Sequence, residues 1–163
     1  MIPDELREGG RLFGEWISGV PEQLEKMQPI SVRFGIQPLE LRSEDGFARI
    51  GYSVPKDYCN YMGFVHGGIL STLLDDASGM AAGLLVGAGF KGTASSSISY
   101  LAPVRSGDVV VEAQIVRYTK SLLFSEASLF RDGNLCTRGV STMSYGTRRA
   151  KKFEESTEKM DSQ

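Results

Sequence analysis

The segment NYMGFVHGGILSTLLDDASGMAAGLLV, residues 60–86, decides how this chain of 163 residues folds. From position 69 onward its apolar residues recur at the i, i+3, i+4 and i+7 spacings of a helix, over an arc too wide for a surface helix. These residues are Ile69, Leu70, Leu73, Leu74, Ala77, Met80, Ala81, Leu84 and Leu85. The pattern therefore predicts a central helix from about Gly67 to Val86 that is wrapped by a sheet.

Segments with strand features lie on both sides of this helix. Residues 30–41 and 47–54 predict a strand pair that turns at Ser43-Glu44-Asp45-Gly46. Arg131-Asp132-Gly133-Asn134 is typical of a hairpin turn, and apolar and polar residues alternate most clearly in residues 109–116. After the helix, strands are predicted at residues 93–101, 108–118, 122–131 and 135–145. One buried helix among antiparallel strands indicates an α+β fold.

The composition is that of an ordinary globular protein, with 41% hydrophobic residues, 23% charged residues and a formal net charge of -2. The length suits one domain with a full hydrophobic core. A nucleic-acid partner is not expected, because binding through phosphate neutralisation needs a basic surface. The balance of charge still allows a local basic patch that holds one phosphorylated small molecule.

The sequence divides into three zones. Residues 1–28 are predicted to form an N-terminal helical extension of two short helices, because Gly9-Gly10 and Val20-Pro21 interrupt the helical pattern. Residues 29–147 hold the strands and the central helix of the main domain. Residues 148–163 form a charged tail, which we expect to be flexible at its end.

Cysteine usage and the chain start predict a cytoplasmic protein. Cys59 and Cys136 match no metal or redox spacing, and residues 1–7 are acidic and polar rather than like a secretory signal. Free thiols in a reducing compartment are therefore expected. The uncharged run at residues 77–90 is 14 residues long. A membrane span needs roughly 18, so no membrane association is predicted.

The only histidine, His66, precedes Gly67 and Gly68 where the helix is predicted to begin. The first N–H groups of a helix lack partners within it and lie at its positive end, which suits an oxygen that carries negative charge. We interpret the Gly67 N–H as a donor to a carbonyl oxygen. His66 would shape the turn or contact the ligand rather than act as the main base. The alternative is that the two glycines only let the helix start pack closely.

Two carboxylates, Asp75 and Asp76, follow about two turns into the helix. Adjacent helical residues point about 100° apart, so the two cannot face the same way. Asp75 shares its face with small and polar residues, which leaves room for a ligand, whereas Asp76 could bond to protein partners or reach a subunit contact. Periodicity leaves the choice between them open. In the following strand, Thr93, Ser95 and Ser97 are expected to share one face, and one hydroxyl could orient a water.

Several enzyme classes lack their motifs here. There is no Gly-x-Ser-x-Gly elbow, no P-loop, no G-x-G-x-x-G after a strand and no H-E-x-x-H. One histidine and two distant cysteines make no convincing metal site. The sequence therefore predicts a site without a metal and without a separate cofactor.

Three motifs resemble one known family, the hot-dog fold acyl-CoA thioesterases of the phenylacetate-pathway (PaaI-like) type. The resemblance covers roughly residues 28–146. Its motifs are Asn60-x5-His66-Gly67-Gly68-x6-Asp75, then Gly92-Thr93-x4-Ile98-Ser99-Tyr100-Leu101-x-Pro103, and then Arg117-Tyr-Thr-Lys120-Ser121 with Asp132-Gly133-Asn134-Leu135. The resemblance implies a long central helix wrapped by a curved antiparallel sheet. It also implies that two such units pair into a continuous double sheet, often as a dimer of dimers, that is, a homotetramer.

The resemblance also implies residue roles, with active sites at the dimer interface. Asn60 and the Gly67 N–H would hold the thioester carbonyl, beside His66. The partner subunit's Asp75 would be nucleophile or general base, and Thr93 would help to place the water. The choice of Asp75 over Asp76 rests on this alignment.

Substrate binding beyond the carbonyl is also expected from the resemblance. Gly68 would lie against the substrate, and the CoA arm would run along the interface towards Lys120 and Arg117. CoA is then part of the substrate and not a cofactor.

The predicted activity is hydrolysis of an acyl-CoA thioester to a free acid and CoA. Hydrogen-bond donors to the carbonyl oxygen, together with one carboxylate, suit this reaction, because a thioester is already an activated acyl donor. One alternative is a hot-dog hydratase or dehydratase, whose histidine and acidic residue occur in different motifs that are missing here. The other is a non-catalytic acyl-CoA binding protein, which would have no need of a carboxylate near the thioester.

Overall fold

The computed structural model describes residues 1–19 and 29–147 of the chain. In chain order its elements are α1 (Asp4–Gly19), α3 (Pro29–Arg33), β1 (Gln37–Arg42), β2 (Phe47–Val54), the 3-10 turn η1 (Lys56–Tyr58), α4 (Gly67–Val86), the 3-10 turn η2 (Gly87–Gly89), β3 (Phe90–Tyr100), β4 (Gly107–Tyr118), β5 (Leu122–Arg131) and β6 (Asn134–Tyr145). The central helix has the bounds predicted from its apolar periodicity.

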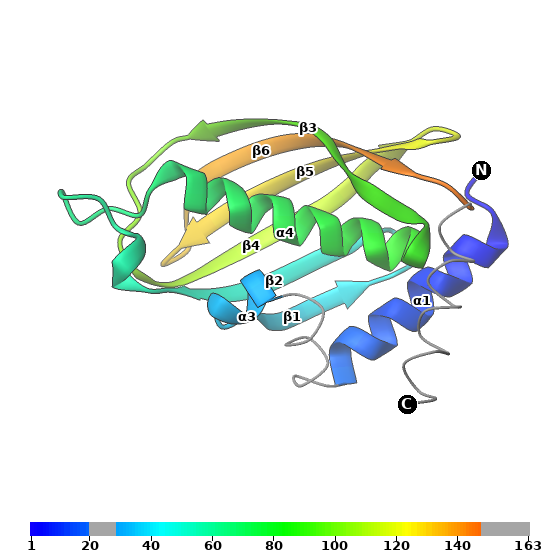
Figure 1. Ribbon diagram of the computed structural model, residues 1–163, viewed down its shortest axis with the longest axis horizontal. Coiled ribbons are helices and arrows are strands. Elements are labelled where there is room, and N and C mark those ends of the chain that lie inside the picture. The colour runs from blue at the N-terminus through cyan, green and yellow to red at the C-terminus, as the bar shows by residue number, and fades with distance from the viewer. Residues whose placement is uncertain (20–28, 148–163) are drawn as a thin grey trace.

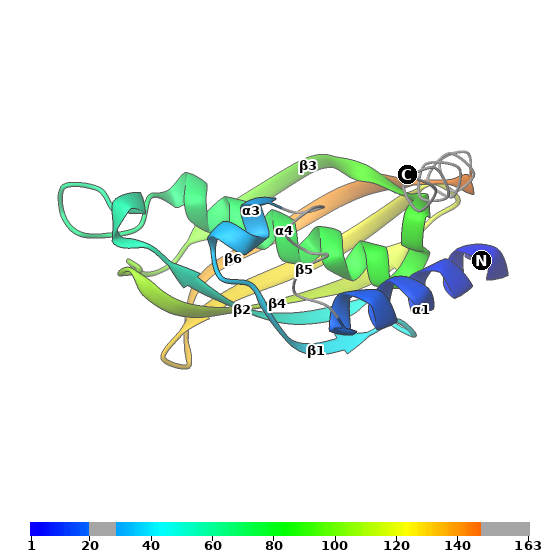
Figure 2. The ribbon, with the colours of Figure 1, turned by 60° about the horizontal axis from the view of Figure 1, so that its bottom comes forward.

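The strands form one six-stranded antiparallel sheet in the order β1-β2-β4-β5-β6-β3. Figures 1 and 2 show that the sheet curves and that α4 lies along its inner face. The side chains of Leu73, Leu74, Met80 and Leu84 on α4 are almost completely buried there. The predicted α+β architecture, with a long helix wrapped by a curved antiparallel sheet, is therefore confirmed.

The predicted alternation in β4 is confirmed, because Val109, Val111, Ala113 and Ile115 are all buried against the core. The predicted β5–β6 hairpin is also confirmed. Its two loop residues, Asp132 and Gly133, have φ values of 50° and 77°, the backbone of the tight turn that matches the twist of antiparallel strands.

Helix α1 differs from the prediction, because it continues through Gly9-Gly10 as one helix of 16 residues. The reason is its packing against the end of α4 (Figure 1). A Cβ atom at Gly10 would lie 2.2 Å from the carbonyl oxygen of Leu84, so only glycine allows the two helices to approach so closely. This packing offsets the low helix propensity of glycine. The predicted second helix and the charged tail lie outside the described residues.

The prediction of a strand over residues 30–41 is wrong in its first half, where Pro29–Arg33 is a helical turn. Two contacts far along the sequence stabilise this turn. Ser31 donates a hydrogen bond to Asp76, and the buried ring of Phe34 lies 5.0 Å from that of Tyr58. Gly35, at φ +57°, then ends the turn as a C-terminal glycine commonly does.

Helix α4 with its following turn, Gly67–Gly89, is 23 residues long and apolar enough to cross a membrane by length and composition alone. The short uncharged run of 14 residues therefore does not exclude a membrane span by length. Burial explains the composition, because 67% of the apolar window is buried inside the fold.

Candidate active site

The start of α4 presents free backbone donors at an exposed position. His66 is the residue before the first helical turn, with extended backbone (φ −59°, ψ 138°), and its carbonyl accepts the amides of Ile69 and Leu70. The His66 amide donates to the carbonyl of Tyr58 at 3.0 Å, which ties the helix start to η1. The amides of Gly67 and Gly68 belong to the first turn, where a helix offers them no internal acceptor. Together with the helix dipole, they suit an oxyanion.

The two glycines have different surroundings. A Cβ atom at Gly67 would lie 3.0 Å from Cζ of Tyr100, so a larger residue there would have to displace the aromatic ring by a few tenths of an ångström. At Gly68 no atom lies within 4 Å of the Cβ position. Gly67 is thus explained in part by close packing, as the alternative interpretation proposed. The space beside Gly68 is open, so a ligand can approach the backbone there.

Asn60 is oriented by its own loop. Its Oδ1 accepts the backbone N–H groups of Met62 and Phe64, at 3.0 and 3.2 Å, and its backbone amide donates to the carbonyl of Phe64 at 2.7 Å. Because Oδ1 is occupied by two donors, the side-chain orientation is fixed and Nδ2 faces elsewhere as a donor. Asn60 can therefore supply a hydrogen bond to a carbonyl oxygen.

Asp75 is exposed on α4 and faces the edge strand β3, where the Thr93 hydroxyl donates to its Oδ1 at 2.7 Å. The structure therefore brings these two predicted site residues together. The expectation that Thr93, Ser95 and Ser97 share one face is wrong. A bulge between Thr93 and Ser95 shifts the register against β6, so Thr93 faces α4 while Ser95 and Ser97 face the other side of the sheet.

Asp76 has its partners inside the chain, which is one of the two roles expected for it. Its two carboxylate oxygens accept the hydroxyls of Ser31 and Tyr52, both at 2.7 Å. Burial raises the pKa of Asp76, the two hydroxyl donors oppose that rise, and the neighbouring charge of Asp75 adds to it. Burial, followed by the charge of Asp76, raises the pKa of Tyr52 well above its ordinary value. The sequence did not identify Ser31 or Tyr52, because no local signal marks such distant contacts.

The structure separates the predicted residues into two groups along α4. Asp75 follows Gly67 by eight residues, which is about 12 Å along a helix axis. A carbonyl oxygen at the Gly67 N–H is therefore out of reach of the Asp75 carboxylate of the same chain. One group holds Asn60, His66, Gly67 and Gly68, and the other holds Asp75 and Thr93.

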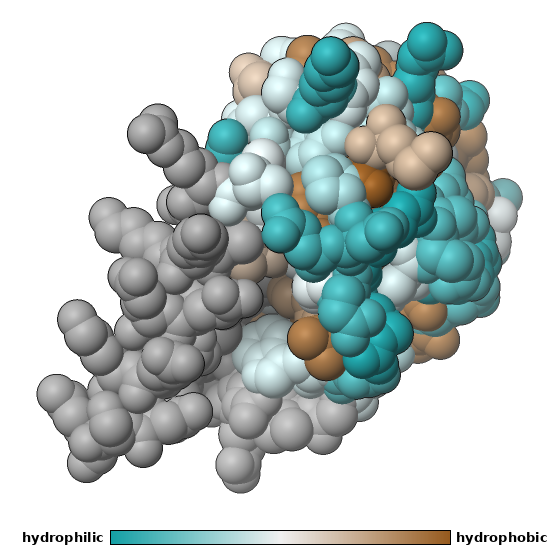
Figure 3. All heavy atoms as spheres, turned by 90° about the vertical axis from the view of Figure 1, so that its right-hand side faces the viewer, coloured by the Kyte–Doolittle hydropathy of each residue, from teal (hydrophilic) through white to brown (hydrophobic). Residues whose placement is uncertain are grey.

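Lys120 and Arg117 lie at the same end of the sheet as Thr93 of the second group, with β6 between β3 and the β4–β5 hairpin. The sheet register runs from Tyr118 through Leu123 and Met143 to Thr93, so the β4–β5 hairpin is at the Thr93 end of the sheet. Both basic side chains are exposed. The surface at this end of the molecule, where α1 also begins, is largely hydrophilic with scattered apolar residues (Figure 3). The structure thus leaves both cations accessible to an anionic ligand.

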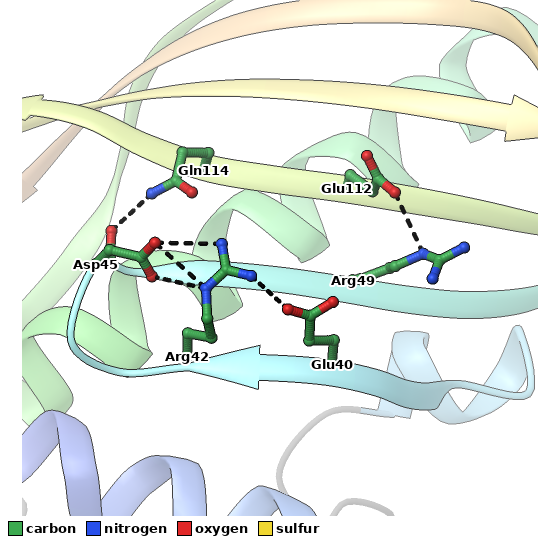
Figure 4. Close-up of polar contacts among 6 residues, drawn as sticks. All are labelled: Glu40, Arg42, Asp45, Arg49, Glu112 and Gln114. Carbon is green, nitrogen blue, oxygen red and sulfur yellow. Dashed lines mark hydrogen bonds and ion pairs between the residues drawn. The ribbon is translucent and has the colours of Figure 1, made fainter.

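Other charged residues lie on the outer face of the sheet and bond to one another. Arg42 pairs with Glu40 and Asp45, and Arg49 pairs with Glu112 at 3.2 Å, as Figure 4 shows. A hollow of about 290 Å³ beside them contains none of the predicted site residues. Within residues 1–19 and 29–147, no histidine, cysteine, aspartate or glutamate side chains form a group of three that could hold a metal ion.

Comparisons with known proteins identify a family for this chain. A family model described as the thioesterase superfamily matches residues 62–137. Human acyl-coenzyme A thioesterase 13 is 32% identical over 97 residues, which are 57% of this chain and 69% of that protein. A curated relative from Caenorhabditis elegans is 28% identical over 95 residues, and the match spans only 56% of its length and 56% of this chain.

Solved structures have the same fold. A hypothetical thioesterase protein of Streptococcus pneumoniae, solved with coenzyme A, has a TM-score of 0.62 and 26% identity, with 70% of this chain and 90% of that chain covered. A mutant of the phenylacetic acid degradation protein PaaI of Thermus thermophilus has a TM-score of 0.66 and 22% identity, with 73% of this chain and all of that chain covered. At this level of identity the second likeness concerns the fold alone.

Proposed function

Because this chain belongs to the thioesterase superfamily and has its hot-dog fold, we propose that it hydrolyses an acyl-CoA thioester to a carboxylic acid and free CoA. The observation that carries the proposal is the exposed carboxylate of Asp75, held by the Thr93 hydroxyl at 2.7 Å. The names of the relatives support the substrate class, since the human relative is an acyl-coenzyme A thioesterase and the Streptococcus pneumoniae structure contains coenzyme A.

In the proposed mechanism, the thioester carbonyl oxygen accepts hydrogen bonds from the Gly67 N–H and from Nδ2 of Asn60. These donors stabilise the negative charge that develops on this oxygen when the carbonyl carbon is attacked. His66 and Gly68 flank the same position. The helix dipole of α4 adds to the stabilisation, because the oxyanion lies at its positive end.

Asp75 supplies the attacking group by one of two routes. As a general base it removes a proton from a water held near Thr93, and the water oxygen bonds to the carbonyl carbon. The carbon–sulfur bond then breaks, and the CoA thiolate takes up the proton that Asp75 received. As a nucleophile Asp75 itself bonds to the carbon and displaces the thiolate, and water hydrolyses the resulting anhydride.

The two groups of residues must come from two chains, because they are about 12 Å apart along α4 in one chain. We propose that β3, which pairs only with β6 among the described strands, pairs with β3 of a second copy and continues the sheet. Asn60 and Gly67 of one chain would then face the partner subunit's Asp75 and the partner subunit's Thr93. Lys120 and Arg117 accompany that second group and would bind CoA phosphates. Two such dimers would form a homotetramer.

The direct test is hydrolysis of a panel of acyl-CoA thioesters, followed by the absorbance of the thioester bond so that Cys59 and Cys136 consume no thiol reagent. Wild type, Asp75→Asn and the control Asp132→Asn, which removes an exposed carboxylate on the β5–β6 turn, are compared. Turnover that only Asp75→Asn abolishes supports the proposal. Turnover retained by Asp75→Asn overturns the assignment. Binding without turnover by wild type would show a non-catalytic acyl-CoA binding protein instead.

The shared site has its own test, in which two inactive chains are combined. Asp75→Asn lacks the carboxylate and Asn60→Ala lacks the carbonyl donor, so each variant alone is expected to be nearly inactive. In a mixed dimer, one of the two sites receives the intact residues of both chains. We expect co-expressed chains to regain part of the wild-type rate. No recovery in mixed dimers of verified composition would contradict a site shared between chains.

A further inference from the structure

Two hydroxyl groups converge on the carbonyl oxygen of Gly67. The hydroxyl oxygens of Ser71 and Tyr100 lie 3.1 and 3.0 Å from it, both within hydrogen-bonding distance. The two hydroxyl oxygens are 2.5 Å from each other. Ser71 is one helical turn after Gly67, whereas Tyr100 is the last residue of β3. This cluster, which we call the hydroxyl clamp, therefore joins the start of α4 to the edge strand.

The clamp acts on the part of the backbone with the greatest freedom. Gly67 and Gly68 are consecutive glycines at a helix start, and glycine has the widest choice of backbone conformation. The Gly67 carbonyl and the Gly68 N–H belong to one peptide group, which is planar and trans. Holding the oxygen on one side therefore fixes the direction of the N–H on the other side. The Gly67 N–H belongs to the preceding peptide group, whose carbonyl, that of His66, accepts the amides of Ile69 and Leu70.

Proton counting shows that the clamp works as a chain. Two hydroxyls supply two protons, and the contact of 2.5 Å between them needs one of these. The other proton remains for the Gly67 oxygen, whichever hydroxyl donates it. Hydrogen bonds in such a chain polarise one another, so removal of either hydroxyl weakens the whole.

We propose that Ser71 and Tyr100 are positioning residues, which hold the Gly67–Gly68 peptide so that the N–H groups at the start of α4 face the thioester carbonyl. The proposal rests on the proposed function, because it assigns the clamp to the same oxyanion site. Neither residue needs to touch the substrate. The Tyr100 ring has a separate role in packing against Gly67, which Tyr100→Phe retains.

The test compares Tyr100→Phe, Ser71→Ala and the double variant with wild type in steady-state hydrolysis. Each single change is expected to lower kcat about 10-fold, with KM changed less than about 2-fold, because it removes one link of a hydrogen-bond chain. The double variant is expected to lose little more than either single variant, since both act through one carbonyl. Tyr58→Phe and Ser96→Ala, which remove hydroxyls that bond to Arg33 and Ser141 instead, are controls expected to retain the wild-type kcat.

A second readout is independent of activity. The Ser71 amide donates to the Gly67 carbonyl in the helix, so its hydrogen exchange should accelerate in Tyr100→Phe when the clamp loosens. A kcat within about 2-fold of wild type in both single variants, or additive losses in the double variant, would overturn the proposal. Unchanged amide exchange in Tyr100→Phe would also overturn it. If wild type hydrolyses no acyl-CoA, the proposed function fails, and amide exchange alone still decides whether the clamp holds this backbone.

Discussion

Two consecutive aspartates on α4 are used in opposite ways. Asp75 is exposed, and its hydrogen-bonding partner is Thr93 on the edge strand β3. Asp76 is half-buried and bonds to Ser31 on α3 and to Tyr52 on β2. The two side chains point about 100° apart because they are neighbours on a helix. The rotation of one helix thus sends one carboxylate outward to a surface and the other inward to the protein.

The different surroundings of these two carboxylates indicate different roles for identical side chains. The Asp76 carboxylate has both oxygens bonded within the chain and links three elements, so it serves the structure. The Asp75 side chain is exposed, and its Oδ2 is left for a ligand because the Thr93 hydroxyl bonds to Oδ1. Burial raises the pKa of Asp76, and the Ser31 and Tyr52 hydroxyls counter this rise. The comparison therefore predicts that loss of Asp75 affects turnover and loss of Asp76 affects stability.

The largest expected effect is on turnover in Asp75→Asn. Loss of the general base or nucleophile should lower kcat about 10²- to 10⁴-fold, while the melting temperature and oligomeric state stay at wild-type values. Asp76→Asn should instead retain kcat within about 3-fold, because an amide oxygen still accepts one of the two hydroxyls. Kinetics with thermal melting on both variants check this. Equal losses of kcat in the two variants would remove the distinction between the aspartates.

The next effect is a loss of stability in Asp76→Ala, which removes the carboxylate that accepts the Ser31 and Tyr52 hydroxyls and leaves the buried Tyr52 hydroxyl without this acceptor. An unpaired buried polar group costs about 1–3 kcal/mol, which is roughly 2–4 °C in melting temperature per kcal/mol for a chain of this size. Glu126→Ala is a control that removes an exposed ion pair with Arg138, and such pairs contribute about 0–1 kcal/mol. A melting temperature of Asp76→Ala equal to that of the control would show that the network is not structural.

The sequence predicted those parts of the fold that depend on local pattern. The bounds of α4 follow from its apolar spacing, and the β5–β6 turn follows from Asp132-Gly133. The helical turn at Pro29–Arg33 was mistaken for a strand, because Ile30 and Val32 favour strands locally. A hydrogen bond to Asp76, 45 residues away, outweighs that preference. Likewise, α1 continues through two glycines because of its contact with α4.

The candidate site was predicted as a set of residues and not as a geometry. Membership in a thioester hydrolase family, which the motifs around His66 and Asp75 indicated, is confirmed by the comparisons. The roles of Asn60, Gly67 and Asp75 stay predictions. The bulge at Thr93 and the contact of Tyr100 with Gly67, 33 residues away, are set by strand register, which no local pattern reveals. The contact of Ser71 with the Gly67 carbonyl could have been predicted from the sequence, since Ser71 lies one helical turn after Gly67.

A smaller effect is expected for Tyr52→Phe, which retains the buried ring and removes one donor to Asp76. The expected loss is about 0.5–1.5 kcal/mol in the free energy of unfolding, less than that of Asp76→Ala because Ser31 still bonds to the carboxylate. Chemical denaturation of both variants measures the two losses. The double variant Tyr52→Phe/Asp76→Ala should be little worse than Asp76→Ala alone, because the partners share one interaction. Additive losses would show that Tyr52 stabilises the fold independently of Asp76.

The smallest effect is a dependence of stability on pH. Because burial raises the pKa of Asp76 in the folded protein, the folded state binds its proton more tightly than the unfolded state between the ordinary aspartate pKa and the raised one. The contribution of this titration to the free energy of unfolding is therefore complete below the ordinary pKa, and it declines as pH rises through the raised pKa. Asp76→Asn lacks this titration, so wild type should lose stability relative to Asp76→Asn over that interval.

Denaturation of both proteins in a pH series from about 3 to 7, the range in which aspartates titrate, measures this difference. Tyr52→Phe sharpens the result, because the Tyr52 hydroxyl lowers the pKa of Asp76 by donating to it. In Tyr52→Phe, which lacks that donor, the loss of stability with rising pH should therefore occur at higher pH. A difference between wild type and Asp76→Asn that stays constant would mean that the Ser31 and Tyr52 hydroxyls balance the effect of burial on the pKa of Asp76. A difference that grows in favour of wild type as pH rises would mean that the hydroxyls outweigh burial. In both cases the contrast with Asp75 would rest on geometry alone.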